Sequence, residues 1–423
     1  MGACSAVFRI PEMTTEVRAV RENELEKMIE LQCVIFPRRG DRQRYQNYVR
    51  EDCSYDLEQT RVVVVDGTLV STLRIWDRRI RIGRTAVRMG GIGRVGTHPD
   101  HRNLGFASML LQDTVDAMRV QGYLTSVLFT EIGSEYYRRH GWASVPMAGF
   151  RISLVHKGMS RIDRIPGWKV DKFDFRTDLE PAATMYTDCN RNQSGSLVRE
   201  RSYWESKPAQ IRGIFPTTVV RDPSGKFAGY LNYDIVGDEA VVSEVSLDGE
   251  HAATNLIAQF LDTCYECGVH TIVGEVPHRH PFVDELSERC GGDLQLTGHS
   301  KTMWKCLNLH ALFIVLLPEL QERLDNYGTI SCRFVILHIN CEQIELGCTE
   351  EGRLWFGEVQ DSGTEKVALR GELFWRLLLG ESSWNSIEDI LIARGASIGT
   401  EQAEFLQVLF PQRDVLYWAP DHF

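Results

Sequence analysis

The spacing of apolar residues changes several times along the first 155 positions of the chain. Apolar side chains recur at helical spacing over residues 24–36, and again from residue 104 to Gly122. Runs of β-branched and other apolar residues lie between and after these stretches and are typical of strands. Asp66-Gly67, between two such runs, is a strong hairpin signal. The pattern predicts alternating helices and strands, with strands at 61–65, 69–76, 80–87 and 126–130.

The same alternation of helical and strand-like patterns continues, with weaker signals, to the end of the chain. Helical spacing recurs at 181–188, 255–267, 374–379 and 387–393. Strand-like runs stand at 217–220, 229–235, 240–245 and 333–339, and a hairpin signal stands at 350–352. No low-complexity linker interrupts the chain, which ends in an aromatic tail at 416–423. We therefore expect an α+β (mixed α/β) protein with three tightly packed domains, at residues 1–155, 156–305 and 306–423.

Length and charge narrow the classes of function. At typical domain sizes, 423 residues form about two to four packed units. The hydrophobic fraction of 43% and the charged fraction of 25% are those of a globular protein. The net charge of −11 argues against a nucleic acid or an anionic membrane as partner, because phosphates need a basic surface. The same charge mildly favours amines or other cationic substrates.

Cysteine usage and the absence of long apolar segments indicate a cellular compartment. The 11 cysteines are odd in number and spread from Cys4 to Cys348, which is typical of reduced thiols rather than of a disulfide framework. The apolar run at 311–317 stops at Pro318, far short of the roughly 20 residues of a membrane span. The N-terminus lacks a basic-then-apolar signal pattern. We expect a cytoplasmic protein.

One segment of the first region has the features of an anion-binding loop. A strand that ends at Val95-Gly96-Thr97 leads through a loop to Arg102-Asn103-Leu104-Gly105-Phe106-Ala107, where an amphipathic helix begins. Gly105 and Ala107 keep side chains out of the way, so backbone N–H groups and the helix dipole can face phosphates. Arg102 can add a charge-assisted contact. The pattern Arg-x-x-Gly-x-Ala is weak alone, and its position between a strand and a helix gives it weight.

A second motif follows the next predicted strand, at Tyr136-Tyr137-Arg138-Arg139-His140-Gly141-Trp142. With both motifs, the run from Gly91 to Trp142 resembles the core of a GNAT-family N-acetyltransferase. The whole chain, with a motif-bearing region, a motif-less region and a last region that ends in an aromatic residue, resembles the Eis-like (enhanced intracellular survival) branch. The resemblance implies two tandem GNAT-type domains with central mixed sheets, followed by a sterol-carrier-protein-like domain.

The resemblance also implies a ligand, an assembly and a set of binding residues. The co-substrate would be acetyl-coenzyme A, and the assembly a homo-oligomer such as a hexamer. Two positions depart from the family pattern, because Ile132 replaces a small polar residue and Asn103 replaces a basic one. The implied cofactor-binding residues are Val95, Gly96, Thr97, Arg102, Asn103, Leu104, Gly105, Phe106, Ala107, Ser108, Ile132 and Gly133.

Acetyl transfer to an amine needs a base for the ammonium and an acid for the departing thiolate. The resemblance implies Tyr137 as the acid, with Tyr136 as the competing candidate. Many GNAT enzymes carry a glutamate on the central strand, but residues 88–97 contain no carboxylate. In Eis-like proteins the terminal carboxylate reaches the first domain's site, which implies Phe423 as the base. The apolar tail favours a docked end over a frayed one. Other candidates for the base are His98, His140, Glu131 and Glu135.

These observations predict an N-acetyltransferase that moves an acetyl group from acetyl-coenzyme A directly to a primary amine. The resemblance implies an aminoglycoside, a polyamine or a lysine side chain as the acceptor. A non-catalytic carrier of acyl-coenzyme A or lipid is the alternative. No metal is expected, because Cys264 and Cys267, although followed by His278 and His280 at zinc-like spacing, fall on an apolar helix face and fit a core.

Overall fold

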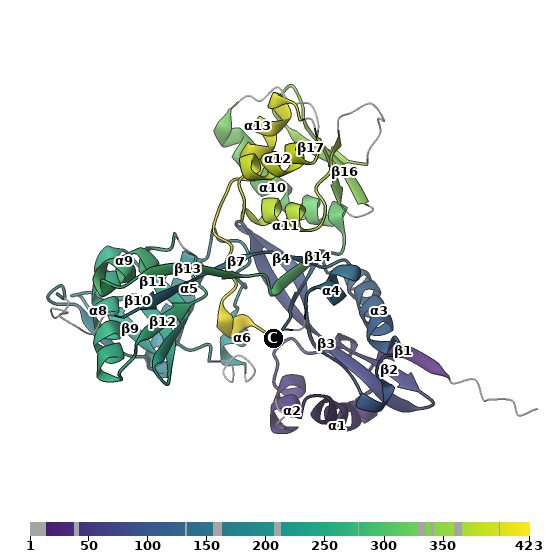
Figure 1. Cartoon of the computed structure of the whole chain (residues 1–423), viewed down its shortest axis with the longest axis horizontal. Helices are drawn as coiled ribbons and strands as arrows, with labels where there is room; N and C mark the ends of the chain where they lie inside the picture. The colour runs from purple at the N-terminus through teal and green to yellow at the C-terminus, as the bar shows by residue number, and fades with distance from the viewer. Residues whose placement is uncertain are drawn as a thin grey trace, which may run out of the picture.

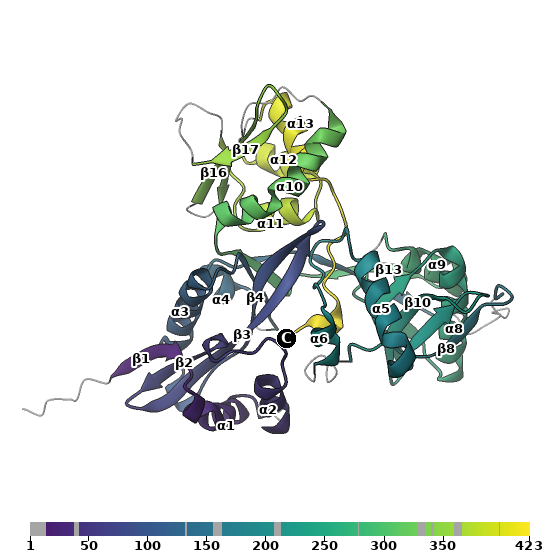
Figure 2. The same ribbon diagram turned by 180° about the vertical axis from the view of Figure 1, so that it is seen from behind.

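The computed structural model of the chain has three lobes that meet at a central junction (Figure 1). It describes residues 14–37, 42–131, 133–154, 163–206, 213–277, 279–328, 335–339, 342–358, 366–396 and 398–423. The C-terminal segment leaves the third lobe and ends between the other two, as the view from behind also shows (Figure 2). Within these described ranges, no helix is long and apolar enough to cross a membrane.

A seven-stranded mixed sheet forms the centre of the first lobe. Alternate residues of the second strand point to opposite faces, so Val63 and Val65 join one apolar cluster while Val62 and Val64 join another. Helix α3 (Phe106–Val120) covers the first cluster, and α1 (Leu25–Ile35) with α2 (Arg42–Arg50) covers the second. In sheet order, the strands are β1 (Thr15–Ala19), β2 (Thr60–Val65), β3 (Thr68–Ile82), β4 (Thr85–Thr97), β5 (Thr125–Phe129), β14 (Thr302–Cys306) and β6 (Ala143–Ser144).

Two tight turns set the register of this sheet. The predicted hairpin at Asp66-Gly67 is confirmed: both residues have positive φ, 46° and 79°, as the favoured two-residue hairpin turn requires. The strands predicted at 69–76 and 80–87 are wrong in their division, because β3 runs unbroken to Ile82 and the chain turns at Gly83. The polar residues that suggested a break between them lie within β3, where they pair with β4.

A second seven-stranded sheet forms the centre of the second lobe. Helices α5 (Phe175–Cys189), α8 (Glu250–Glu266) and α9 (Pro281–Cys290) pack on it, with Leu256, Phe260 and Leu286 fully buried. A short helix, α6 (Arg201–Glu205), lies near the junction (Figure 1). In sheet order, the strands are β13 (Leu294–His299), β7 (Met147–Ser153), β12 (Thr271–Gly274), β11 (Glu239–Leu247), β10 (Phe227–Val236), β9 (Thr218–Arg221) and β8 (Lys169–Lys172).

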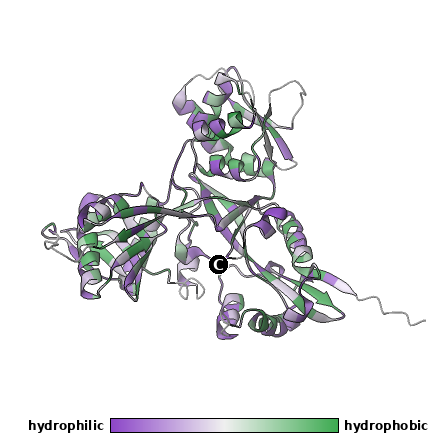
Figure 3. Cartoon of the chain, in the orientation of Figure 1, coloured by the Kyte–Doolittle hydropathy of each residue, from purple (hydrophilic) through white to green (hydrophobic). Residues whose placement is uncertain are grey.

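The third lobe combines a small sheet with four helices. The sheet has the order β17 (Leu354–Gly357), β16 (Glu342–Cys348), β15 (Val335–Ile339) and β18 (Lys366–Val367). The helices are α10 (Leu309–Tyr327), α11 (Glu372–Leu379), α12 (Trp384–Ala393) and α13 (Thr400–Leu409). Apolar residues gather along these helices and along the strands of the two large sheets (Figure 3). The mixed α/β fold class predicted from the sequence is confirmed.

Two strands cross between the first two lobes. β7 precedes the predicted boundary at 155/156 but lies in the second sheet, beside β12 and β13. β14 precedes the predicted boundary at 305/306 but lies in the first sheet, between β5 and β6. Both strands are short and mix apolar with polar residues, and periodicity does not reveal which sheet such a strand joins. The lobes therefore do not divide where the chain order suggested.

Candidate active site

The predicted motif strand separates from its neighbour within the first sheet. β4 pairs with β5 only from Met89 to Ile92, although β4 continues to Thr97. Immediately after this pairing β4 carries a bulge, since Arg74 of β3 pairs with Gly93 whereas Thr72 pairs with Gly96. Arg94, the extra residue, has a positive φ of 57°. The bulge bends β4, and the edge of Val95–Thr97 that faces away from β3 is left without a strand partner within the described residues.

The loop after β4 has the geometry of an anion-binding helix start. Asn103 and Gly105 have positive φ values of 63° and 84°, and Gly105 caps α3. Within the described residues, no hydrogen bond is recorded for the backbone N–H groups of residues 103–107. Phe106 is buried and fixes the helix to the core, while Leu104 is 57% exposed. Exposed N–H groups at the positive end of a helix fit a diphosphate.

Arg102 and Ser108 flank this loop on either side. The Arg102 side chain donates a hydrogen bond to the Thr97 carbonyl at 3.4 Å, which ties the loop to the end of β4. The Ser108 hydroxyl lies 3.4 Å from the Tyr136 hydroxyl and 3.2 Å from His140 Nε2. Gly133 is exposed with open space around it, and Ile132 lies outside the described residues. The residues predicted from Val95 to Ser108 therefore surround one strand end and one helix start.

The predicted acid, Tyr137, lies on the short helix α4 (Glu135–Arg139). Its ring contacts Tyr136 and Trp142 edge-on, at centroid distances of 5.2 and 6.4 Å. Burial raises the pKa of Tyr137 to about 12, so the phenol keeps its proton at neutral pH. Tyr136, the competing candidate, is half-buried as well and directs its hydroxyl toward Ser108. The contact between the Tyr136 and Ser108 hydroxyl groups could not be predicted from the sequence.

The predicted base, Phe423, lies directly against β4. A Cβ atom added at Gly91 would stand 2.2 Å from the Phe423 ring, and one added at Gly93 would stand 3.4 Å from the Phe423 carboxyl carbon. The ring stacks on Trp76 at 6.2 Å and meets Phe129 edge-on at 5.1 Å. The glycines of β4 thus make room for the last residue. The structure brings the terminal carboxylate to the point where β4 leaves β5.

A buried ion cluster that the sequence did not reveal holds the tail in place. Arg199 Nε donates to Asp421 Oδ1 at 2.9 Å, and Arg199 Nη1 donates to Glu244 Oε1 at 3.0 Å. The Tyr203 hydroxyl donates to Asp421 at 2.9 Å, and the Tyr230 hydroxyl to Glu244 at 2.6 Å. Burial raises the pKa of Glu244. A lone carboxylate in an apolar tail signals that a cation must meet it, but the sequence does not say which.

Further contacts dock the tail along the second lobe. Leu416 N–H donates to the Ser194 carbonyl at 2.8 Å, and Trp418 Nε1 donates to Asn190 Oδ1 at 3.0 Å. Tyr417 and Trp418 are 1% exposed. The end of the chain is therefore docked rather than frayed, and residues of the second lobe position Phe423 over a strand of the first.

The other candidate bases lie in less suitable surroundings. His98 Nδ1 accepts a hydrogen bond from Asp100 N–H, and the Glu135 carboxylate pairs with Arg138 at 2.9 Å. Glu131 is exposed. Burial, followed by Lys305 and Arg139, lowers the pKa of His140. Among the described residues, neither Glu135 nor His140 has a hydrogen bond, ion pair or ring contact with β4 or with Phe423.

One buried carboxylate near Trp76 is already neutralised. Asp52 accepts from Arg74 at 2.7 Å and from Arg78 at 2.8 Å. Burial alone would raise the pKa of Asp52, but the two guanidinium groups hold that pKa well below its usual range. Asp52 therefore cannot take up a proton near neutral pH, and it does not replace the missing strand carboxylate.

The zinc-like spacing forms no metal site in the described part of the chain, where no group of three or more His, Cys, Asp and Glu side chains could hold an ion. Cys264 is buried among core residues, and burial raises its pKa to about 12. Cys267 is exposed at the end of α8, and His278 lies outside the described residues.

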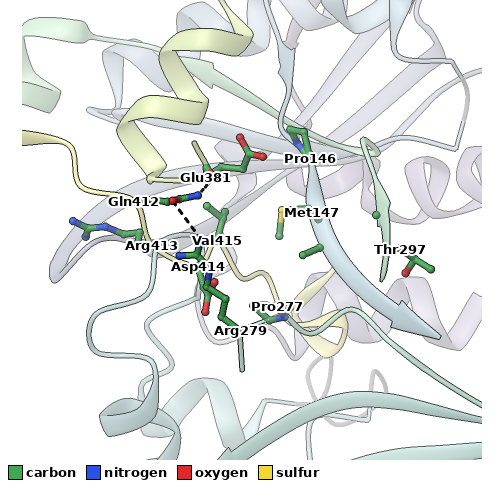
Figure 4. Close-up of a pocket in the computed structure, with 12 residues that line it drawn as sticks. Pro146, Met147, Pro277, Arg279, Thr297, Glu381, Gln412, Arg413, Asp414 and Val415 are labelled. Carbon is green, nitrogen blue, oxygen red and sulfur yellow. Dashed lines mark hydrogen bonds between the residues drawn. The ribbon is translucent and has the colours of Figure 1, made fainter. Parts of the chain in front are cut away.

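A cavity of about 290 Å³ at the junction, lined in part by Pro146, Arg279, Glu381 and Asp414, is separate from the predicted site (Figure 4).

Comparison with known proteins agrees with this geometry. Residues 16–145 match the family model described as acetyltransferase (GNAT) domain. The first lobe carries a GNAT acetyltransferase domain. The matched segment contains β4, the bulge, the predicted anion-binding loop and the helix that carries Tyr137. The prediction that the chain is an acyltransferase is thereby confirmed.

Solved structures extend the similarity of fold over 97% of this GNAT-containing chain. A probable N-acyltransferase from Enterococcus faecalis, described as a conserved protein of unknown function, is 17% identical with a TM-score of 0.74, covering 97% of this chain and 100% of its own. A GCN5-related N-acetyltransferase from Kribbella flavida is 16% identical, with a TM-score of 0.70 and coverages of 97% and 99%. Eis1 from Mycobacterium abscessus is 15% identical, with a TM-score of 0.65 and coverages of 97% and 100%. None of the curated proteins compared with the chain matches it.

Proposed function

We propose that the protein is an N-acetyltransferase that moves an acetyl group from acetyl-coenzyme A directly to a primary amine. The observation that carries this proposal is the position of the Phe423 carboxyl group beside Gly93, where β4 separates from β5. A strand edge for the pantetheine amides, a helix start for the diphosphate and a carboxylate for the amine then meet at one place.

The chain's own residues supply the binding. The backbone N–H groups of residues 103–107, with Arg102, hold the diphosphate, and the edge of Val95–Thr97 pairs with the pantetheine arm. Acetyl-coenzyme A supplies a thioester, whose carbonyl carbon the unprotonated amine attacks. The Phe423 carboxylate attracts the ammonium form of the amine and accepts its proton, directly or through a water molecule.

Tyr137 assists the departure of the sulfur. The pKa of its phenol, about 12, lies roughly 3 to 4 units above that of an ordinary thiol, so complete proton transfer to the thiolate is unfavourable. Tyr137 therefore stabilises the leaving sulfur by donating a hydrogen bond, and the proton removed from the amine completes the thiol. The C–N bond forms as the C–S bond breaks, with no covalent enzyme intermediate.

The proposal also covers the domain architecture, the oligomeric state, the cellular compartment and the acceptor. Similarity to Eis1 over almost the whole chain supports an Eis-like architecture, with a second GNAT-type domain and a third domain of sterol-carrier type. It also supports a homo-oligomer, for which a hexamer is the first state to test. The described cysteines are free, in keeping with a reducing, cytoplasmic compartment. An aminoglycoside, a polyamine and a lysine side chain are the first acceptors to test.

Extending the chain beyond Phe423 tests the function and the base together. Adding Gly-Ser-Gly after Phe423 moves the carboxylate away from Gly93, and we expect thiol release from acetyl-coenzyme A with a panel of amines to fall at least about a hundredfold. Affinity for coenzyme A should not change. The control is the same tripeptide added at the N-terminus, which should leave the rate intact.

Two outcomes would contradict the proposal. Full activity in the C-terminally extended protein would remove Phe423 from the mechanism. Coenzyme A binding without thiol release for any amine, in the unextended protein, would favour the alternative of a non-catalytic acyl-coenzyme A or lipid carrier.

A further inference from the structure

Two arginines converge on one phenol on the face of the sheet that α1 and α2 cover. Arg44 of α2 donates from Nε to the Tyr48 hydroxyl at 2.6 Å, and Arg94 of the β4 bulge donates from Nη2 to the same oxygen at 3.4 Å. Their guanidinium carbons lie 5.6 and 5.3 Å from the centre of the Tyr48 ring. Both side chains are half-buried. Two positive charges thus share a neutral acceptor.

Neither guanidinium group has an acidic partner within the described residues. Their neighbours do: Arg42 and Arg50 of α2 both pair with Glu26, and Arg74 and Arg78 share the carboxylate of Asp52. Two half-buried cations beside each other repel, and a phenol does not compensate their charge. An anion between them would receive charge-assisted hydrogen bonds from both.

The arginine pair lies next to the proposed base. Tyr48 meets Trp76 edge-on at 5.3 Å, and Trp76 stacks on Phe423 at 6.2 Å. Arg94 directly follows Gly93, the residue beside the Phe423 carboxyl carbon. Tyr48, Trp76 and Phe423 belong to one apolar cluster, whereas Phe106 at the diphosphate loop belongs to the cluster on the opposite face. The pair therefore lies on the Phe423 side of the sheet, opposite the cluster that contains Phe106.

We infer that Arg44 and Arg94 form an anion subsite for the acceptor, which is a primary amine that also carries a carboxylate or a phosphate. The inference rests on the proposed N-acetyltransferase function. The amine of such a molecule lies at the Phe423 carboxylate while its anionic group reaches the two guanidinium groups. Local charge thereby selects a zwitterionic acceptor, although the chain as a whole carries a net charge of −11.

Three small amines of similar length test the subsite. Thiol release from acetyl-coenzyme A is measured with ethanolamine, β-alanine and O-phosphoethanolamine, which differ at the end remote from the nitrogen. We expect kcat/KM for β-alanine, for O-phosphoethanolamine or for both to exceed that for ethanolamine by at least about tenfold. Whichever anionic amine is preferred identifies the anionic group as carboxylate or phosphate.

Substitutions at the subsite assign the preference to the arginines. The double variant Arg44→Gln/Arg94→Gln should lose most of the preference through KM, and Arg44→Lys/Arg94→Lys should restore part of it. The matched control is Arg42→Gln/Arg50→Gln, which removes the same charge from the exposed side of α2, where both arginines pair with Glu26. The control variant should keep the preference of the unmodified protein.

Calorimetric titration separates the subsite from the reaction. Binding of β-alanine or O-phosphoethanolamine that the double glutamine variant loses, without turnover of any amine, would uphold the subsite and reject the proposed function. Turnover of ethanolamine at least equal to that of both anionic amines would overturn the subsite and leave the function standing. A preference that persists in the double variant would also overturn it. If none of the three amines binds and none is turned over, the subsite is overturned as well.

Discussion

At the scale of single residues, burial sets the protonation of the Tyr137 phenol. The raised pKa of about 12 keeps the phenol protonated throughout the neutral range. Tyr137→Phe removes the donor while the ring stays against Tyr136 and Trp142, so the packing changes little. We expect the maximal rate of acetyl transfer to fall about ten- to a hundredfold, with affinity for coenzyme A unchanged.

The pH dependence of the maximal rate checks the same residue. A group with a raised pKa loses its proton only as the pH rises through that value, so deprotonation of Tyr137 should cause no falling limb below about pH 11. Tyr136→Phe is the comparison, because the Tyr136 hydroxyl contacts Ser108. An unchanged rate in Tyr137→Phe together with a reduced rate in Tyr136→Phe would assign the hydrogen-bond donor to Tyr136 instead.

Some single residues of the candidate site could be predicted from the sequence alone. Gly105 and Arg102 could be chosen because a helix start with a small residue has one evident use. The Phe423 contact with β4 followed only from family resemblance, since no local pattern connects the last residue to a strand more than 300 positions away. The convergence of Arg44 and Arg94 on Tyr48 could not be predicted from the sequence, because it depends on a bulge that gives Arg94 its positive φ.

At the scale of elements, the tail is positioned by the buried cluster of Arg199, Asp421 and Glu244. Asp421→Asn removes one charge of a pair whose side chains are fully buried, so the last turn should loosen from the second lobe. We expect kcat to fall at least about tenfold because Phe423 leaves β4, while KM for acetyl-coenzyme A stays the same. The rate and the KM are both read from thiol release.

Digestion by carboxypeptidase supplies a readout that does not depend on activity. The docked tail should resist removal of Phe423, and Asp421→Asn should release it faster. Glu401→Gln, an exposed change on α13, is the control and should behave as the unmodified protein does. An Asp421→Asn protein with an unchanged kcat and a resistant tail would show that the ion cluster does not position the end.

Most elements could be predicted from periodicity, but their partners could not. Helix α3, strand β5 and the hairpin between β2 and β3 each have a local signal within their own residues. The places of β7 and β14 in the two sheets depend on contacts between distant segments. The residue pattern within a short strand does not indicate which sheet the strand joins. The missed continuity of β3 has the same origin, because pairing with β4 overrides a local polar break.

At the scale of the whole molecule, Trp304 joins the first lobe to the third. It follows the second sheet in the chain, lies in β14 of the first sheet, and packs its fully buried ring 5.5 Å from that of Trp375 in the third lobe. We expect Trp304→Ala to lower the free energy of unfolding by about 3–5 kcal/mol. Circular dichroism and tryptophan fluorescence should both report one shifted thermal transition for the whole chain.

A half-buried tryptophan provides the matched control for this prediction. Trp168 contacts His251 within the second lobe and belongs to no strand that crosses between lobes. Trp168→Ala should cost much less stability, because less apolar surface is lost from the core. Separate transitions, of which Trp304→Ala shifts only one, would show that the lobes unfold independently.

The exchange of β7 and β14 also has a consequence for the newly made chain. The ribosome finishes β5 at Phe129, but the strand that covers its free edge begins only at Thr302. At typical rates of synthesis, about 5–20 residues per second, the edge waits roughly 10–30 s for its neighbour. During that interval β5 is open to pairing with other nascent chains. Slow codons between the segments that encode β5 and β14, or a shortage of chaperones during synthesis, should therefore reduce the yield of folded protein. In the finished sheet β5 is protected by β14.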